Sequence, residues 1–321
     1  MILVIGKIPP PIGGVTIYVS RLLKKLSKTP YEFNFLKLNI FNMLFPYYHI
    51  FNSRVVHLIA SNPLIRLYIS VLCLIFKKKI IITYTDSFNE FSNSFYNYLN
   101  RLSLKISSHP MVLNKKSLEI CKKINTKTKL ISAFIPPEIN DSNLDNLKKE
   151  LDINYKKFDS IFCTNAFSFC LDKFNNELYG IIPLVSLFNN LNTKILIICD
   201  PSGTYKTYFE KHKIILGKNI KLLSNNVFSF IDVVKLSDCL IRATTTDGDS
   251  LSIHEAFYFN KDVITSDCVD RPPNCILYKN NDFSKLNEVV SNYQRASNLT
   301  SHKENRNGFD YMLDVYSEII K

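Results

Sequence analysis

The chain has 321 residues, of which 46% are hydrophobic and 21% are charged. These fractions are typical of globular proteins and exclude an intrinsically disordered chain, and the length is sufficient for two domains. The formal net charge of +12 predicts anionic partners, which leaves nucleic acid, acidic phospholipid and phosphorylated small molecules open.

Short apolar runs recur along the whole chain and are typical of buried strands. They cover residues 1–6, 55–60, 79–85, 111–114, 128–134, 160–166, 194–200, 239–244, 262–267 and 275–279. Segments with helical spacing separate many of these runs, which is the pattern of βαβ units. The sequence therefore predicts an α/β protein with two Rossmann-like, doubly wound parallel-sheet domains.

The boundary between the two domains is expected in the polar segment 135–160, which begins with two prolines. The predicted division is 1–150 for the first domain and 151–305 for the second. Residues 306–321 contain a segment with helical spacing, from Gly308 onwards, which is expected to pack back onto the first domain.

The first helix is predicted after the loop "KIPPPIGG", residues 7–14. The prolines exclude a helix within the loop, and Gly13 and Gly14 permit a tight turn. A glycine turn between a strand and a helix leaves backbone amides free to bind an anion. A plain strand-to-helix connection is an equally good interpretation of this loop.

Eight cysteines occur singly, without spacing suited to a metal, and we interpret them as reduced core thiols of a cytosolic protein. The longest apolar stretch, residues 64–76, contains Arg66 and is shorter than the ~20 residues that a membrane-spanning helix needs. Lysines cluster in the same half of the chain, which predicts a surface resting on anionic lipid. A solvated basic face over a buried helix is the alternative.

The stretch "IRATTTDGDSLSIHEAF", residues 241–257, carries the strongest chemical signal. A strand is expected to end near Arg242, and a helix is expected to begin around Ser250, with the hydroxyls of Ser250 and Ser252 capping its amides. Such a helix start favours a phosphate, whereas the carboxylates of Asp247 and Glu255 favour sugar hydroxyls. The combination predicts a ligand with both a diphosphate and a sugar. The alternative is that the aspartates only cap the helix and Glu255 lies on the surface.

This region resembles the donor-binding region of GT-B glycosyltransferases, especially the retaining group called family 4. That group has two acidic residues separated by seven others, then a turn and a strand that ends in Ser-Asp. Here Asp247 and Glu255 hold the acidic positions, and "NKDVITSD" (260–267) matches the turn and strand. The pair Arg271 and Pro272 resembles a branch that makes bacterial surface polysaccharides such as O-antigen and capsule. Residues 13–26, 158–167, 178–191 and 194–203 are similar to other parts of the family.

The resemblance implies two Rossmann-like domains facing a cleft, with the acceptor bound by the first domain and the nucleotide sugar by the second. It implies that Glu255 holds the ribose and Asp247 the donor sugar, and both are the expected catalytic residues. The further residues expected to bind the donor are Gly13, Gly14, Lys173, Arg242, Gly248, Asp249, Ser250, Leu251, Ser252 and Arg271. The amides from Asp249 to Ser252 would face the diphosphate.

Two departures from the family stand out. Ser168 occupies the place where an arginine usually neutralises the diphosphate, and Lys173 is the nearest cation; Arg242 or Arg271 could replace the missing charge. The histidine that many relatives carry after their "KIIIT"-like strand is absent, and Asp86 is only a weak substitute. His57 is interpreted as a satisfied core histidine rather than a catalytic one, and His254 receives no role.

The expected function is transfer of a sugar from a nucleoside-diphosphate sugar to a lipid-linked or oligosaccharide acceptor in bacterial surface polysaccharide synthesis, with retention of configuration. No cofactor is expected, and "DGD" (247–249) is not expected to hold a metal. The expected location is the inner face of the cytoplasmic membrane. A degenerate GT-B protein that binds a sugar nucleotide or a partner without turnover is the second hypothesis. Nucleic-acid binding is disfavoured because no recognition motif or aromatic stacking pattern is present.

Overall fold

The computed structural model describes residues 1–85, 88, 93–138, 144–153, 157–172, 174–224, 228–294 and 307–320. The chain divides into two compact units, the first comprising Met1–Pro136 with Asn305–Lys321 and the second Pro137–Glu304. The division lies at the start of the polar segment, 14 residues before the predicted position, and it groups helix α7 (Leu144–Leu151) with the second unit.

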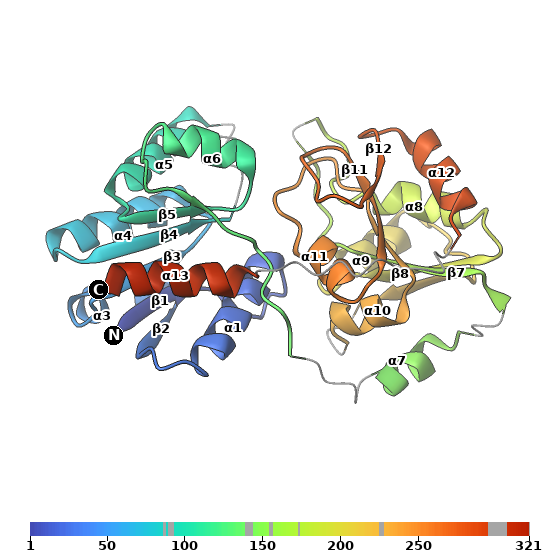
Figure 1. Cartoon of the computed structure of the whole chain (residues 1–321). Coiled ribbons are helices and arrows are strands. Elements are labelled where there is room, and N and C mark those ends of the chain that lie inside the picture. Colours follow the sequence, from blue (N-terminus) through green and yellow to red (C-terminus); the bar gives the residue numbers. More distant parts are fainter. Residues whose placement is uncertain are drawn as a thin grey trace. The chain divides into compact units, whose positions relative to one another are not determined.

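The first unit is built on a parallel sheet with the strand order β2-β1-β3-β4-β5-β6. Its strands are β1 (Ile2–Gly6), β2 (Phe33–Lys37), β3 (Val55–Ile59), β4 (Lys79–Tyr84), β5 (His109–Val112) and β6 (Lys129–Leu130). Its helices are α1 (Gly14–Leu26), α2 (Ile40–Leu44), α3 (Tyr47–Phe51), α4 (Pro63–Ile75), α5 (Ser94–Ile106), α6 (Lys115–Lys122) and α13 (Gly308–Ile320). Figure 1 shows these helices on both faces of the sheet.

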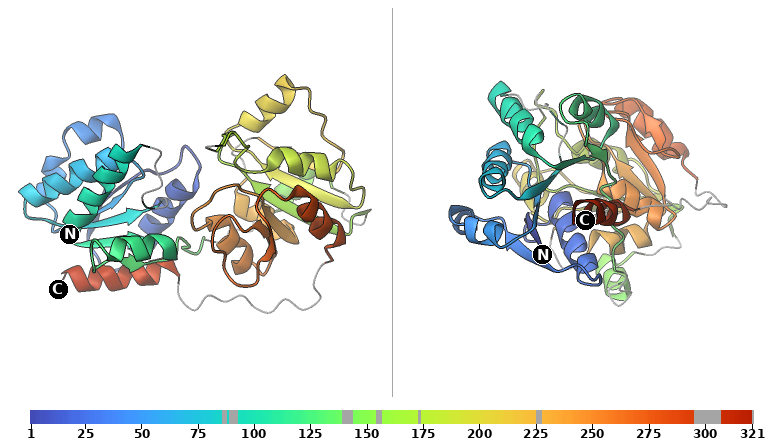
Figure 2. Two further views of the ribbon diagram at one scale, coloured as in Figure 1. Left: turned by 90° about the horizontal axis from the view of Figure 1, so that it is seen from above. Right: turned by 60° about the vertical axis from the view of Figure 1, so that its left-hand side comes forward.

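Alternating strand residues supply the two cores of this unit. Ile2 and Val4 pack with α1 and α13, whereas Leu3 and Ile5 pack toward α3, α4, α5 and α6. Helix α13 therefore belongs to the first unit, and Figure 2 shows it beside α1. Its first residue fits closely, because a Cβ at Gly308 would lie 2.2 Å from the carbonyl oxygen of Ser132.

The buried imidazole of His57 ties α13 to the sheet. Nδ1 lies 2.6 Å from the Tyr316 hydroxyl, and Nε2 lies 2.9 Å from Oγ1 of Thr83. Burial lowers the pKa of His57 to about 3, so the ring is neutral, with one nitrogen donating a hydrogen bond and the other accepting one. The interpretation of His57 as a core histidine is confirmed.

The second unit repeats the architecture with the strand order β12-β11-β10-β7-β8-β9, again all parallel. Its strands are β7 (Ser160–Asn165), β8 (Lys194–Cys199), β9 (Ile220–Leu223), β10 (Cys239–Arg242), β11 (Asp262–Ser266) and β12 (Ile276–Tyr278). Its helices besides α7 are α8 (Ile181–Phe188), α9 (Thr204–Lys211), α10 (Phe230–Leu236), α11 (Leu251–Tyr258) and α12 (Phe283–Asn292). One core lies under α8, α9 and α12, and the other under α7, α10 and α11.

The prediction of an α/β protein with two doubly wound parallel sheets is confirmed. Each predicted apolar run contains a strand, but β2 and β9 were not predicted. Both lie at sheet edges and are partly exposed, with Asn34 and Lys221 among their residues, so neither forms a continuous apolar run. No helix in the described ranges is both long enough and apolar enough to cross a bilayer.

Candidate functional site

The candidate site lies where the strand order of the second sheet reverses, between β7 and β10. In open parallel sheets, ligands bind at the carboxyl ends of the strands at such a switch point. Asn165 ends β7 and Arg242 ends β10, and Nη1 of Arg242 lies 3.5 Å from the Asn165 carbonyl oxygen. The predicted strand end at Arg242 is therefore confirmed and coincides with the switch point.

The turn before helix α8 approaches this position closely. Gly180 precedes the helix with φ +69°, and a Cβ there would lie 2.4 Å from the carbonyl oxygen of Ala243. Only glycine permits this contact between the chain after β7 and the chain after β10. The guanidinium of Arg242 lies over the ring of Tyr179, with Cζ 5.4 Å from the ring centroid.

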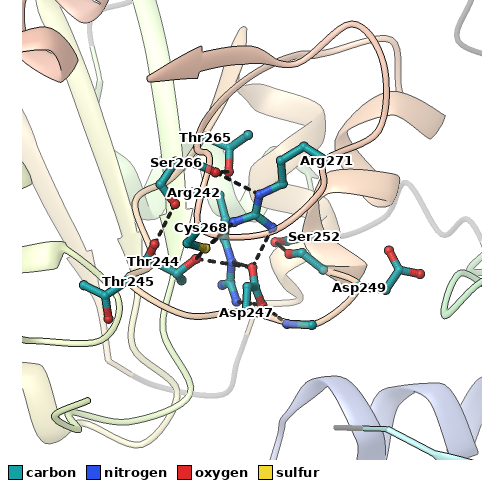
Figure 3. A network of polar contacts seen from close by, with 12 residues as sticks. Arg242, Thr244, Thr245, Asp247, Asp249, Ser252, Thr265, Ser266, Cys268 and Arg271 are labelled. Carbon is teal, nitrogen blue, oxygen red and sulfur yellow. Dashed lines mark hydrogen bonds and ion pairs between the residues drawn. The ribbon is translucent and has the colours of Figure 1, made fainter. Parts of the chain in front are cut away.

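The loop after β10 folds back so that the Asp247 carboxylate meets two guanidinium groups (Figure 3). Arg242 donates to both carboxylate oxygens, from Nε at 3.0 Å and from Nη2 at 3.2 Å. Arg271 donates from Nη1 to Oδ2 at 3.0 Å and from Nε to the Ser266 carbonyl at 3.0 Å. The Asp247 side chain is only 10% exposed, so these contacts are shielded from water.

Burial and charge act in opposite directions on this group. Burial alone would raise the pKa of Asp247, but the charges and hydrogen bonds of the two arginines outweigh it and hold the pKa below its usual value. Burial likewise lowers the pKa of Arg242, and the neighbouring carboxylate more than reverses this effect. Asp247 is therefore ionised, and the three side chains carry one net positive charge.

This arrangement bears on the role that the family resemblance implies for Asp247. Contact with donor-sugar hydroxyls stays a prediction, because both carboxylate oxygens already accept hydrogen bonds from arginines. The amide of Gly248 also donates to Oδ1 at 3.0 Å, and the Thr244 hydroxyl lies 3.3 Å from Oδ2. In this geometry Asp247 orients two cations.

Helix α11 begins at Leu251, with Ser250 as its N-cap residue, in agreement with the predicted start. The expected capping is wrong in detail: the Ser250 hydroxyl lies 3.0 Å from the Ser252 hydroxyl and forms no capping hydrogen bond. The two serines thus satisfy each other, and the first turn keeps backbone amides free of a side-chain cap. That is the arrangement that favours an anion at a helix N-terminus.

The other predicted acidic residues lie on different sides of this helix start. Asp249 points away from the arginines (Figure 3), and its Oδ1 lies 2.5 Å from Nε2 of His254. Glu255 is 4% exposed, so it is a buried residue and the alternative of a surface residue is wrong. Lys173 and Asp86 lie outside the described residues. Ser168 is described and is partly buried.

Asn165 is a candidate that the sequence patterns did not indicate. Its side-chain oxygen is buried at the end of β7 and has no hydrogen-bond partner within the described ranges. A buried acceptor beside Arg242 is suited to a ligand hydroxyl or amide. The sequence feature that could have identified Asn165 is its position at the end of the first strand of the second domain.

In the first unit, the predicted glycines lie at the start of α1. Gly13 is the N-cap residue, and the helix begins at Gly14, where a Cβ would meet no atom of the described residues within 4 Å. Packing among these residues therefore does not require glycine at position 14. Open space beside a helix N-terminus is compatible with a bound anion, and this role stays a prediction.

No protein-family model matches the chain, and no curated protein matches it in sequence. Solved structures match it in fold. HepE from Anabaena, in complex with UDP and glucose, has a TM-score of 0.73 at 12% identity, covering 99% of this chain and 98% of that chain. Sucrose-phosphate synthase from Thermosynechococcus elongatus has a TM-score of 0.72 at 14% identity, covering 100% and 99%. UDP-GlcNAc 2-epimerase from Methanocaldococcus jannaschii has a TM-score of 0.65 at 16% identity, covering 99% and 100%.

The chain therefore has the two-domain α/β fold of the GT-B glycosyltransferases. Structures with this fold include complexes with UDP and with UDP-glucose. The fold is shared by transferases and epimerases of sugar nucleotides, so activity has to be argued from the site.

Proposed function

We propose that the protein is a glycosyltransferase that uses a nucleoside-diphosphate sugar as its donor. The observation that carries the proposal is the pair Arg242 and Arg271, held by Asp247 at the switch point of the second sheet, close in sequence to the uncapped start of α11. A diphosphate needs cations and oriented amides, and this part of the second unit supplies both.

In this proposal the two arginines supply the positive charge of the arginine that the family usually carries at the place of Ser168. Ser168 replaces the usual arginine, and Arg242 and Arg271 provide two guanidinium groups against one carboxylate. Asp247 is then a positioning residue, which keeps the guanidinium planes fixed before the ligand arrives. Glu255 accepts hydrogen bonds from the ribose, as the family resemblance implies.

In the proposed reaction, the bond between the anomeric carbon and the diphosphate oxygen breaks, and a bond from that carbon to an acceptor hydroxyl oxygen forms. The acceptor hydroxyl passes its proton to the departing diphosphate oxygen, and the nucleoside diphosphate leaves. Negative charge grows on the leaving group, so fixed guanidinium groups and amides there lower the barrier. Retention of configuration and an acceptor carried on lipid, at the inner face of a bacterial membrane, belong to the proposal through the family resemblance.

Thermal stability against a panel of nucleoside diphosphates and their sugar conjugates tests donor binding. A ligand present at about 100 times its Kd adds about 2.7 kcal/mol to the free energy of unfolding. We expect one nucleotide to stabilise the wild type and to have little effect on Glu255→Gln, which keeps the side-chain volume. Glu288→Gln, at a half-exposed position on α12, is the control and should respond like the wild type. Equal stabilisation of all three proteins would exclude the role of Glu255.

Binding without turnover is the second candidate, and the serine at position 168 favours it. Release of nucleoside diphosphate from the stabilising donor, in the presence of polyprenyl-diphosphate-linked sugars, separates the two. Release that depends on the acceptor identifies a transferase. Tight donor binding without release or sugar transfer identifies the non-catalytic protein.

A further inference from the structure

Helices α2, α3 and the outer face of α4 leave large apolar side chains uncovered in the first unit. Ile40 and Phe41 are 80% and 81% exposed, and Phe45, Tyr48 and Phe51 are each more than 60% exposed. Helix α2 contains no buried residue although its sequence is IFNML. Core packing therefore does not explain these side chains. Single exposed apolar residues are normal on a protein surface, whereas a group of adjacent ones marks an interaction site.

Ring contacts connect α2, α3 and the end of α4, whose exposed apolar side chains are here named the α2–α4 surface. The ring centroids of Phe45 and Tyr47 lie 6.0 Å apart, and this contact joins α2 to α3. The ring centroids of Phe51 and Phe76 also lie 6.0 Å apart, and this contact joins α3 to the end of α4. Helix α4 continues the surface with Leu74 and Ile75. Its opposite face, with Ile69 and Cys73, is buried in the core.

The stretch of sequence that forms the α2–α4 surface carries charge of a single sign. From Phe33 to Thr85 the sequence contains no aspartate or glutamate. Lys37, Arg54, Lys77 and Lys79 are exposed within this range. Nζ of Lys78 lies 5.5 Å from the centroid of the Phe51 ring, so a cation directly borders the apolar side chains.

We infer that the α2–α4 surface docks on an anionic phospholipid bilayer, with α2 and α3 as the segment that enters the headgroup region. Exposed phenylalanine and tyrosine beside lysine are typical of a membrane interface, where rings sit at headgroup level and lysine ammonium groups contact lipid phosphates. A protein interface is less consistent with this composition, because lysine is depleted there.

This inference rests on the membrane location in the proposed function, and it names the segment responsible. The surface lies in a different unit from the arginine site, so lipid binding and donor binding can be measured, and can fail, separately. The apolar run at residues 64–76 had indicated only α4. Residues 40–51 were not recognised from the sequence.

Sedimentation of the full chain with vesicles tests the inference. The vesicles contain phosphatidylcholine alone or phosphatidylcholine with phosphatidylglycerol. The test variant is Ile40→Ser with Phe41→Ser, and the matched control is Ile215→Ser with Phe174→Ser, whose side chains are 82% and 70% exposed in the second unit. A second test variant, Lys37→Gln with Lys77→Gln, removes two positive charges near the α2–α4 surface. Its control, Lys206→Gln with Lys213→Gln, lowers the net charge by the same amount in the second unit.

The wild type and both controls should bind the anionic vesicles and bind neutral vesicles much more weakly. The apolar test variant should bind at least about tenfold more weakly. The lysine test variant should bind about twenty-five-fold more weakly, since each of its two lost cations contributes about a factor of five near an anionic surface. Equal binding of test and control variants would overturn the inference. A second result would also overturn it: the wild type does not bind vesicles but forms a dimer in analytical ultracentrifugation, and Ile40→Ser with Phe41→Ser disrupts this dimer.

Discussion

Asp247 accepts hydrogen bonds from Arg242 through both of its carboxylate oxygens, at 3.0 and 3.2 Å. Arg271 approaches the same carboxylate from 24 residues further along the chain. One carboxylate thus fixes two guanidinium groups at the carboxyl end of β10. This relationship gives the second unit two oriented guanidinium groups at the switch point of its sheet.

Replacing Asp247 should destabilise the second unit. Asp247→Ala leaves two largely buried guanidinium groups without their counter-ion, and breaking a buried pair costs about 3–5 kcal/mol. Urea unfolding followed by circular dichroism measures the loss. Asp145→Ala is the control, because the Asp145–Lys148 pair in the same unit is exposed and should contribute less than about 1 kcal/mol. A similar small loss in both variants would mean that the arginines are stable without Asp247.

Arg271 should contribute to phosphate binding and not to recognition of the nucleoside. We expect Arg271→Gln to weaken UDP binding by about tenfold to a hundredfold, the effect of losing a hydrogen bond between charged groups. Binding of uridine should be unchanged. Calorimetric titration of both ligands measures this, with Lys285→Gln, at an exposed pair on α12, as a control for net charge. Equal loss of UDP and uridine binding would instead indicate that Arg271→Gln disrupts the folding of the second unit.

Gly180 and Gly203 form a matched pair, since both have positive φ, +69° and +72°. At Gly203 a Cβ would meet no atom within 4 Å in the part of the chain that the structure describes, so Gly203→Ala should cost only the conformational strain of about 1–2 kcal/mol. At Gly180 the same methyl group would collide with the Ala243 backbone. Gly180→Ala should therefore be clearly less stable than Gly203→Ala in urea unfolding. Equal stability of the two variants would show that the turn before α8 can move away from β10.

Acid should destabilise the first unit through His57. Its pKa is about 3 in the folded protein and 6.5 when unperturbed, so below pH 6.5 the unfolded chain binds a proton that the folded chain does not. The free energy of unfolding then falls as the pH falls from 6.5 toward 3, by up to about 1.4 kcal/mol per pH unit. Hydrogen exchange of α13 peptides at several pH values, corrected for the intrinsic exchange rate, measures the effect.

The control for this titration is His57→Gln, which cannot take up the proton. This variant should be less stable than the wild type near neutral pH, because it loses the contacts to Tyr316 and Thr83. Its stability should depend less on pH below 6.5. The same pH dependence in both proteins would assign the acid sensitivity to other groups, such as the His109–Glu318 pair.

Local sequence patterns were sufficient to predict the central strands and the start of α11. The apolar runs located the central strands, because strands covered on both faces of a parallel sheet are continuously apolar. The change from the run ending at Arg242 to the serines before "IHEAF" located the switch-point loop and the start of α11. Edge strands β2 and β9 escaped detection because half-exposed strands carry polar residues.

Only the tertiary structure decided which distant groups meet and which apolar groups stay uncovered. His57 contacts Tyr316 across 259 residues, and Arg271 returns to Asp247, because packing of whole elements sets these distances. The residues of α2 resemble core residues in composition, yet none is buried. Periodicity reports how apolar a face is, whereas exposure depends on what the rest of the chain places against it.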